Sequence, residues 1–120
     1  LLSALFGKRE HLLYLGDVAP DATHIHQTKL GVQPVRLKDI QGTNGRPDRF
    51  DVAFRPLSRR MKQRWVGIAE AMLHDATKLS PIQAVKIGDV YYVQDGNHRV
   101  SVARALGNLF IDANVTEWQL

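Results

Sequence analysis

The sequence contains no cysteine, and this absence excludes disulfide bonds, thiolate metal sites and cysteine nucleophiles. A chain without disulfides suits a reducing compartment, so we expect a cytoplasmic protein. No apolar run approaches the roughly 20 residues that a membrane-spanning helix needs, so we expect no membrane partner. Because the sequence begins with Leu1 rather than methionine, the lack of a targeting segment carries no weight.

Aromatic residues are also scarce, at 8% of the chain, and few of them lie among the basic residues. This scarcity argues against a platform that stacks single-stranded nucleic acid. Positive charge is in excess, with a net charge of +4 and a pI near 9.7, which favours a phosphate-bearing partner such as nucleotide or nucleic acid. A length of 120 residues, 44% of them hydrophobic, is sufficient for one domain with its own core.

Apolar periodicity predicts a mixed α/β (α+β) domain with a small mixed sheet, packed helices and an N-terminal helical arm. The hairpin signal is Gly88-Asp89, a two-residue connection that suits a primed turn, and Gly107 is a helix stop. We predict helices over residues 2–15, 57–75 and 98–106, strands over 32–40, 82–87, 90–93 and 110–118, a polar connector over 17–31 and a loop over 42–51. The arm therefore occupies 1–31 and the domain 32–120.

The helix predicted over residues 57–75 has two contrasting faces. It begins either with Ser58 as a cap or with Pro56 in its first turn. Its apolar face contains Leu57, Met61, Trp65, Ile68, Met72 and Leu73. Its basic face, a candidate nucleic-acid patch, contains Arg55, Arg59, Arg60, Lys62 and Arg64. Such a face follows a nucleic-acid backbone by charge alone, or it is a solvated surface.

The motif that points most strongly to chemistry is DGNHR, residues 95–99, between an apolar strand and a helix. A helix N-terminus offers unpaired N–H groups and a partial positive charge, so the backbone itself binds an anion there. Gly96 permits the turn and the close approach of a ligand, and Asn97 either caps the helix or takes a left-handed conformation. His98 and Arg99 add donors, and an arginine can hold phosphate through two parallel bonds.

Asp95 stands at the end of the strand, where its carboxylate either orients a metal-bound water or accepts a proton from an attacking hydroxyl. We therefore name Asp95 and His98 as candidate catalytic residues. In the alternative interpretation, Asp95 and Asn97 form only a turn and a cap, and Arg99 is exposed.

The segment VQDGNHRVSVARALG (93–107), together with the hairpin before it and the strand IDANVTEW after it, resembles the C-terminal half of a ParB/sulfiredoxin-like domain. In that superfamily, chromosome-partition proteins carry GERR at this place, sulfiredoxins GCHR and archaeal free-serine kinases DGHHR, and the kinase motif is the closest in letters. The resemblance implies that Gly96, Asn97, His98 and Arg99 bind the phosphates of ATP, ADP or CTP, with Mg²⁺ as the accompanying ion. It covers roughly residues 32–118 in element order, but only 93–107 closely.

The sequence departs from each branch of this superfamily. Sulfiredoxin chemistry needs a cysteine, and position 97 is asparagine in a chain without cysteine, so that activity is excluded. Partition proteins read DNA with a helix-turn-helix region after this domain, and the residues up to Leu120 contain none. The serine kinases also use an upstream acid, for which the candidates are Asp39, Asp48 and Asp51, without a matching motif.

The loop GTNGRPDRFD, residues 42–51, is a second candidate ligand segment. The resemblance implies that it lies near the nucleotide, so that Arg46 and Arg49 would reach phosphates or a base. Asn44 and Gly45 would supply backbone N–H groups in a bend that binds anions. Alternatively, the two arginines pair with acidic residues of a surface loop.

His24 and His26, combined with His11 or His74, lack a third ligand at metal-binding spacing, so we predict no metal site in the protein itself. Three functions remain. The first is a nucleotide-phosphate-binding domain with Mg-dependent NTP hydrolysis or transfer to a small acceptor. The second is a nucleic-acid-associated partition, regulatory or nuclease module. The third is an inactive interaction domain whose helix 2–15 makes a homodimer contact.

Overall fold

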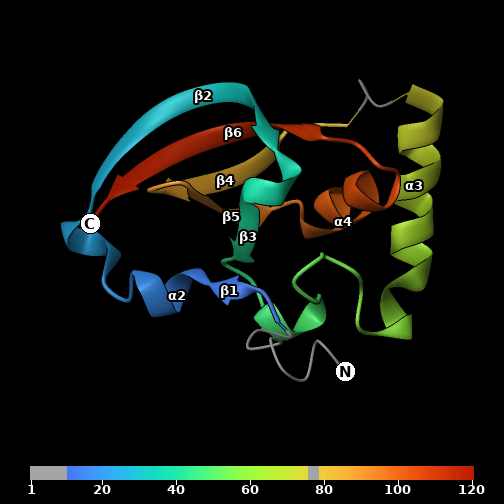
Figure 1. The fold of residues 1–120 in the computed structure, drawn as a ribbon, viewed down its shortest axis with the longest axis horizontal. Helices are drawn as coiled ribbons and strands as arrows, with labels where there is room; N and C mark the ends of the chain where they lie inside the picture. Colours follow the sequence, from blue (N-terminus) through green and yellow to red (C-terminus); the bar gives the residue numbers. More distant parts are fainter. Residues whose placement is uncertain (1–10, 76–78) are drawn as a thin grey trace.

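A six-stranded mixed sheet organises the chain, in the order β1-β3-β5-β4-β6-β2 (Figure 1). The computed structural model describes residues 11–75 and 79–120. Neighbouring strands are parallel in β1–β3, β3–β5 and β4–β6 and antiparallel in β4–β5 and β2–β6. The strands are β1 (Leu13–Tyr14), β2 (His26–Arg36), β3 (Ile40–Thr43), β4 (Ile82–Ile87), β5 (Val90–Asp95) and β6 (Phe110–Gln119).

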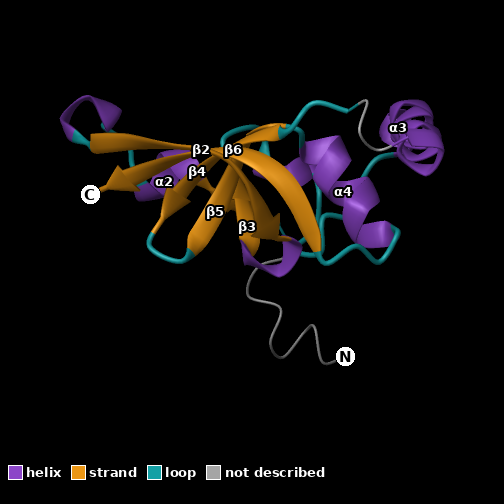
Figure 2. Ribbon diagram, turned by 90° about the horizontal axis from the view of Figure 1, so that it is seen from above, coloured by secondary structure: helices purple, strands orange, loops and turns teal. Residues whose placement is uncertain are grey.

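The helices lie beside this sheet, with α4 between the sheet and α3 (Figures 1 and 2). They are α2 (Leu15–Val18), α3 (Lys62–Asp75) and α4 (Asn97–Ala105). Short 3₁₀ turns occur at Ala22–His24, Leu37–Asp39, Pro47–Arg49 and Arg59–Met61. The predicted mixed α/β class is confirmed. Within the described ranges, no helix has the length and apolarity that crossing a bilayer requires.

Strand alternation distributes the apolar side chains between two cores on opposite faces of the sheet. On β5, Val93 faces the larger core and Tyr92 the smaller. The larger core also contains Ile82, Val100 and Phe54, all fully buried, and is covered by α4 and the loop after β3. Burial of this kind stabilises the fold by roughly 1.5–3 kcal/mol per large side chain.

The C-terminal half agrees closely with its predicted elements. β4 and β5 form the expected antiparallel hairpin across Gly88, whose φ is +60°. The predicted helix begins one residue early, at Asn97, and Gly107 follows it at a φ of +79°. β6 ends one residue beyond the predicted strand.

The N-terminal predictions need correction. The helix expected over 2–15 lies mainly outside the described residues, and Leu13–Tyr14 is a strand that pairs with β3 instead of a helix end. The polar connector expected over 17–31 is wrong for residues 26–31, which are the first half of β2. β2 therefore runs through the boundary expected between residues 31 and 32, and the two parts share one strand.

The strand predicted over 32–40 is two strands with a 3₁₀ turn between them. β2 ends at Arg36, and the Leu37 amide donates to the Leu109 carbonyl at 2.9 Å. The predicted loop 42–51 starts two residues later than expected, because Gly42 and Thr43 belong to β3. Gly42 is required there, since a Cβ would come within 2.3 Å of the Tyr92 ring.

The helix predicted over 57–75 begins as the turn Arg59–Met61, and Ser58 caps it by accepting from the Arg60 amide at 3.2 Å. Its apolar face is narrower than predicted. Leu57 and Leu73 are 50% and 71% exposed, because the helix packs mainly against α4 and one stripe of side chains is enough to cover that contact.

Candidate functional site

The turn between β5 and α4 depends on Gly96. Gly96 takes the left-handed conformation, with φ +117° and ψ +22°, and is the helix cap. A Cβ at this position would lie 2.5 Å from Cγ2 of the buried Ile82. The Val100 amide donates to the Gly96 carbonyl at 3.0 Å, which is the first bond of the helix. The four amides from Gly96 to Arg99 therefore have no acceptor within α4.

Both roles considered for Asn97 are corrected, because Gly96 is the cap and Asn97 is the first helical residue. The Asn97 side chain instead joins two loops. Its Nδ2 donates to Thr43 Oγ1 at 3.0 Å, and the Gly45 amide donates to the same oxygen at 2.9 Å. The Thr43 hydroxyl donates in turn to the Val93 carbonyl at 3.3 Å. Thr43, which sequence reasoning missed, thus fixes the loop after β3 against the DGNHR turn.

His98 is enclosed between the loop and α3. Its ring meets the edge of the buried Phe50 ring, with centroids 5.3 Å apart. Burial, and secondarily the positive charge of Arg64, hold the pKa of the His98 imidazole below its ordinary value. Nδ1 of His98 and Oδ1 of Asn97 are both buried, and neither has a hydrogen-bond partner among the described residues. Buried polar atoms of this kind are uncommon in folded proteins and call for a functional explanation.

Asp95 and Arg99 occupy opposite environments. The Asp95 side chain is 76% exposed and the Arg99 side chain 16%. Arg99 donates through Nη1 to the carbonyls of Ser80 and Pro81, the latter at 3.2 Å, and through Nη2 to Asp95 Oδ2 at 3.3 Å. Most of the Arg99 donors are thus engaged within the protein, and Arg99 positions the Asp95 carboxylate.

A hollow of about 220 Å³ lies over this turn, lined by residues 94–99 and by Arg64 and Ile68 of α3. The Arg64 guanidinium forms no ion pair with another described residue. Sequence reasoning assigned Arg64 to the basic patch and did not connect it with the DGNHR turn. The hollow is smaller than the roughly 300–1,000 Å³ of pockets that enclose a whole ligand. Its size therefore suits a phosphate group of a larger ligand, with the rest of that ligand outside the hollow.

The loop after β3 meets the turn at Asn44 and Gly45, but the amides of both residues, which were expected to bind an anion, donate within the protein. The Asn44 amide donates to the Val93 carbonyl at 2.8 Å, and a Cβ on Gly45 would lie 3.4 Å from Asn97 Nδ2. Arg46 instead pairs with Asp48 at 3.5 Å, and both are exposed. Arg49 is exposed, and its side chain forms no hydrogen bond or ion pair with the described residues of the turn.

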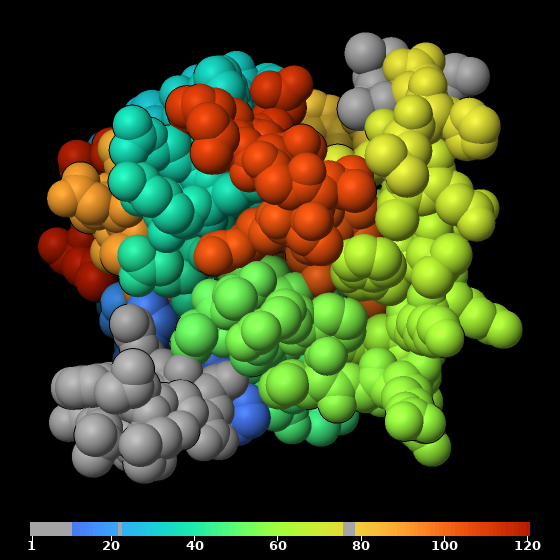
Figure 3. All heavy atoms as spheres, turned by 45° about the vertical axis from the view of Figure 1, so that its right-hand side comes forward, coloured from blue at the N-terminus to red at the C-terminus, as the bar shows by residue number. Residues whose placement is uncertain are grey.

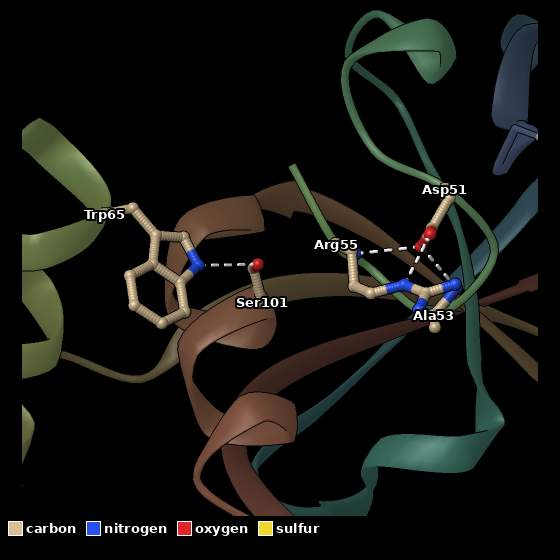
Figure 4. A network of polar contacts seen from close by, with 5 residues as sticks. All are labelled: Asp51, Ala53, Arg55, Trp65 and Ser101. Atoms are coloured by element: carbon tan, nitrogen blue, oxygen red, sulfur yellow. Dashed lines mark hydrogen bonds and ion pairs between the residues drawn. The ribbon is translucent and has the colours of Figure 1, made fainter. Parts of the chain in front are cut away.

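Asp51, one of the three upstream acids considered, is a structural residue (Figure 4). Its Oδ1 accepts from the amides of Ala53 and Arg55, each at 2.9 Å, and its Oδ2 accepts from Arg55 Nε at 2.7 Å. Burial raises the pKa of this carboxyl, but these bonds outweigh the effect and hold it below the ordinary value. They support Phe54, which is fully buried at a φ of +60°.

The predicted basic patch is divided by this arrangement. Arg55 is paired with Asp51, and Arg64 lines the hollow over the turn. Arg59, Arg60 and Lys62 remain exposed at the start of α3. The Trp65 indole donates to Ser101 Oγ at 2.8 Å (Figure 4), and this bond joins α3 to α4 beside Arg64.

The histidines considered for metal binding do not converge. His24 lies 3.8 Å from Asp21, and both are exposed. Across residues 11–75 and 79–120, no group of three or more histidine, aspartate or glutamate side chains is arranged to hold a metal ion.

Comparison with known proteins identifies the fold. No protein-family model and no curated protein matches the chain. The structure is similar to that of sulfiredoxin from Arabidopsis thaliana, with a TM-score of 0.51 and 17% identity, over 70% of this chain and 82% of that chain. The protein has the ParB/sulfiredoxin-like fold, which confirms the resemblance inferred from residues 93–107. At this identity the similarity concerns the fold, and function has to be argued from the site.

Proposed function

We propose that the protein binds nucleotides through their phosphates at the N-terminus of α4. The observation that carries this proposal is that one small hollow is lined both by residues 96–99, whose amides have no acceptor within α4, and by Arg64, which has no ion-pair partner among the described residues. Amides at a helix start and a neighbouring guanidinium are both suited to phosphate oxygens. The turn is already fixed through Thr43, so little ordering would oppose binding.

His98 contributes a hydrogen-bond donor to the same site. Its lowered pKa leaves the imidazole uncharged near neutral pH, and the incoming phosphate charge would raise that pKa. Phosphate binding therefore takes up a proton at His98. Asn97 acts indirectly, because its amide holds the loop of Asn44 and Gly45 beside the phosphate.

Asp95 fits the role of the single protein ligand to Mg²⁺. Magnesium in nucleotide sites is commonly held by one or two carboxylates together with the phosphates and waters, and Asp95 is the exposed carboxylate that lines the hollow. When bound, the ion would neutralise phosphate charge. During phosphoryl transfer, the Asp95 carboxylate would also accept a proton from water or from a small hydroxyl acceptor.

Calorimetric titration of the chain with ATP, ADP and CTP, with and without Mg²⁺, tests the proposal. We expect binding that weakens about tenfold or more in Arg64→Gln, the loss of one charge-assisted contact. Arg60→Gln removes the same charge from a residue that does not line the hollow, and it should leave the affinity within about twofold. Absence of binding by the native protein, or equal losses in the two variants, would reject the site.

Asp95→Asn separates the ion from the phosphate contacts. This variant should retain nucleotide binding without Mg²⁺ and lose the gain that Mg²⁺ provides. Release of phosphate or of a phosphorylated acceptor by the native protein, and its loss in Asp95→Asn, would assign phosphoryl chemistry to the site. A variant that responds to Mg²⁺ as the native protein does would remove Asp95 from ion binding.

A second candidate function, nucleic-acid binding, rests on the three exposed cations Arg59, Arg60 and Lys62, none of which is paired among the described residues. Three phosphate contacts would give a slope of about −3 in log affinity against log salt for duplex DNA. A gel-shift series in rising salt tests this function. Binding without salt dependence, or binding unchanged when all three are glutamine, would exclude the patch.

A further inference from the structure

A second hollow, of about 490 Å³, lies at the C-terminal end of α4. The nine residues of α4 separate it from the DGNHR turn by roughly 14 Å. One wall is the end of β2 with the 3₁₀ turn that follows, and the other is the last turn of α4 with the start of β6. Figure 3 shows these two segments, turquoise and orange-red, side by side on one face of the molecule. Its lining is cationic at Arg36, Lys38 and Arg104 and apolar at Leu37, Leu109 and Phe110.

The three cations of this hollow have no acidic partner within the described parts of the chain. None of them forms an ion pair, and Arg104 donates only to the Leu37 carbonyl, at 3.4 Å. Three positive charges brought together from β2, the 3₁₀ turn after it and α4 repel one another, so an anionic group placed between them is favoured. The hollow is therefore complementary to negative charge.

The same hollow exposes large apolar side chains. Leu109 is 76% exposed and Phe110 51%, and they stand consecutively at the entrance to β6. Neighbouring exposed apolar residues rimmed by charge are typical of interaction sites. The occupant must therefore carry apolar surface as well as negative charge.

The hollow also continues in two directions along the surface. It shares Asn108 and Phe110 with a hollow of about 210 Å³ that reaches Met72 and Asp112. On the other side it shares Lys38 and Arg104 with one of about 230 Å³ that reaches His11. Three hollows in a row form a groove that suits an extended chain, at about 3.3 Å per residue, better than a compact small molecule.

We propose that this groove binds an extended peptide segment of a partner protein, with acidic residues beside an aliphatic or aromatic anchor. The acidic residues lie between Arg36, Lys38 and Arg104, and the anchor covers Leu109 and Phe110. Asp112 marks the end of the groove where the peptide has no acidic residue. Such a site belongs to the groove-binding modes in which a few side chains give the specificity.

Two other occupants fit this chemistry less well. The chain's own first ten residues contain Lys8 and Arg9 against Glu10 alone, so their charge has the wrong sign. Single-stranded nucleic acid has the right charge, but it needs aromatic side chains on which bases stack, and the exposed apolar side chains here are one aliphatic and one aromatic.

Selection from a displayed library of random peptides on the full chain, followed by amide chemical-shift mapping, tests the proposal. We expect the selected peptides to combine aspartate or glutamate with leucine, phenylalanine or tryptophan. We expect them to shift the amide signals of residues 36–38 and 104–110 and to leave those of 95–98 unchanged. Signals that move at 95–98 alone, or a library that yields no acidic-apolar peptides, would overturn the proposal.

The variant Lys38→Gln/Leu109→Ser should weaken these peptides at least tenfold. Lys62→Gln/Leu73→Ser makes the same two changes at exposed positions of α3, and it should leave the affinity within twofold. Equal effects of the two variants, or stronger shifts of the groove amides by a single-stranded oligonucleotide than by the peptides, would refute peptide binding. Nucleotide titration of Lys38→Gln/Leu109→Ser distinguishes this site from the DGNHR turn, because that titration should be unchanged.

Discussion

Replacement of Gly96 by alanine tests whether the DGNHR turn is dictated by its glycine. At φ +117° an alanine is strained, and left-handed conformations cost L-residues about 1–2 kcal/mol. The new Cβ would also stand 2.5 Å from Cγ2 of Ile82, which is fully buried. Overpacking of this kind costs about 1–3 kcal/mol. The lower conformational entropy of the unfolded alanine variant offsets about 0.4–1 kcal/mol of these costs. We expect Gly96→Ala to destabilise the protein by about 3 kcal/mol.

Gly107→Ala is the matched control for this prediction. Gly107 also has a positive φ, +79°, but a Cβ there meets no atom within 4 Å. Only the backbone cost remains, so we expect a loss of about 1 kcal/mol. Urea unfolding followed by circular dichroism measures both variants. Losses that agree within about 0.5 kcal/mol would refute the role assigned to the Ile82 contact.

Ile82→Leu provides a further check on the same contact. Leucine has one γ carbon, so this change removes Cγ2, the methyl group of Ile82 that the alanine Cβ would meet. The change is nearly isosteric and costs less than about 1.5 kcal/mol by itself. Gly96→Ala should therefore be less harmful in the Ile82→Leu background, with a favourable coupling of about 1 kcal/mol. A coupling of zero would place the strain elsewhere.

Three further predictions concern the surroundings of the turn. Ser101→Ala leaves the Trp65 indole without its acceptor and should cost about 0.5–1.5 kcal/mol, with a change in tryptophan emission; an unchanged spectrum and stability would contradict it. Asp51→Asn should cost about 1–2 kcal/mol at pH 7, with most of the loss from its backbone bonds because Arg55 is exposed. The pKa of the Asp51 carboxyl is lowered in the folded protein, so its contribution to stability is fully present above pH of about 3.9 and is lost as the pH falls through the folded pKa. The stabilities of the native protein and of Asp51→Asn should therefore converge in acid. For His98 the folded pKa is also lowered, so stability should fall as pH drops below about 6.5, while nucleotide affinity should rise; His98→Gln should remove both dependences.

The parts of this protein that sequence reasoning predicted correctly are those whose signals are local. The hairpin, α4 and β6 each carry an apolar period and a glycine or turn signal within their own residues. The first half of β2 carries no such signal, because residues 26–30 are exposed on both faces. A strand with no buried face shows no alternation, and its partner β6 supplies the hydrogen bonds that make it a strand.

The candidate site divides in the same way. Gly96 and the helix start that follows it were evident from five consecutive residues. The Thr43 contact, which spans 54 residues, and the position of Arg64 over the turn depend on how separate elements pack. Arg99 was expected to bind phosphate together with Gly96, Asn97 and His98, yet its side chain is turned to the Ser80 and Pro81 carbonyls. Residue type alone does not determine which arginine is free.

The two walls of the site differ in how firmly they are held, and this difference has a measurable consequence. The turn is fixed by Thr43 in the central sheet, whereas Arg64 stands on α3, which has no fully buried residue. A helix with so little burial opens locally at lower free energy than the core strands do. A nucleotide held by both walls loses the Arg64 contact when α3 opens. Since that contact is expected to contribute about tenfold to affinity, saturating nucleotide should stabilise the closed helix by about 1.4 kcal/mol. Hydrogen exchange at the amides of α3 should then slow about tenfold, while exchange in β4 that proceeds by other local openings should slow less. Equal protection of both elements would mean that the ligand does not bridge the turn and α3.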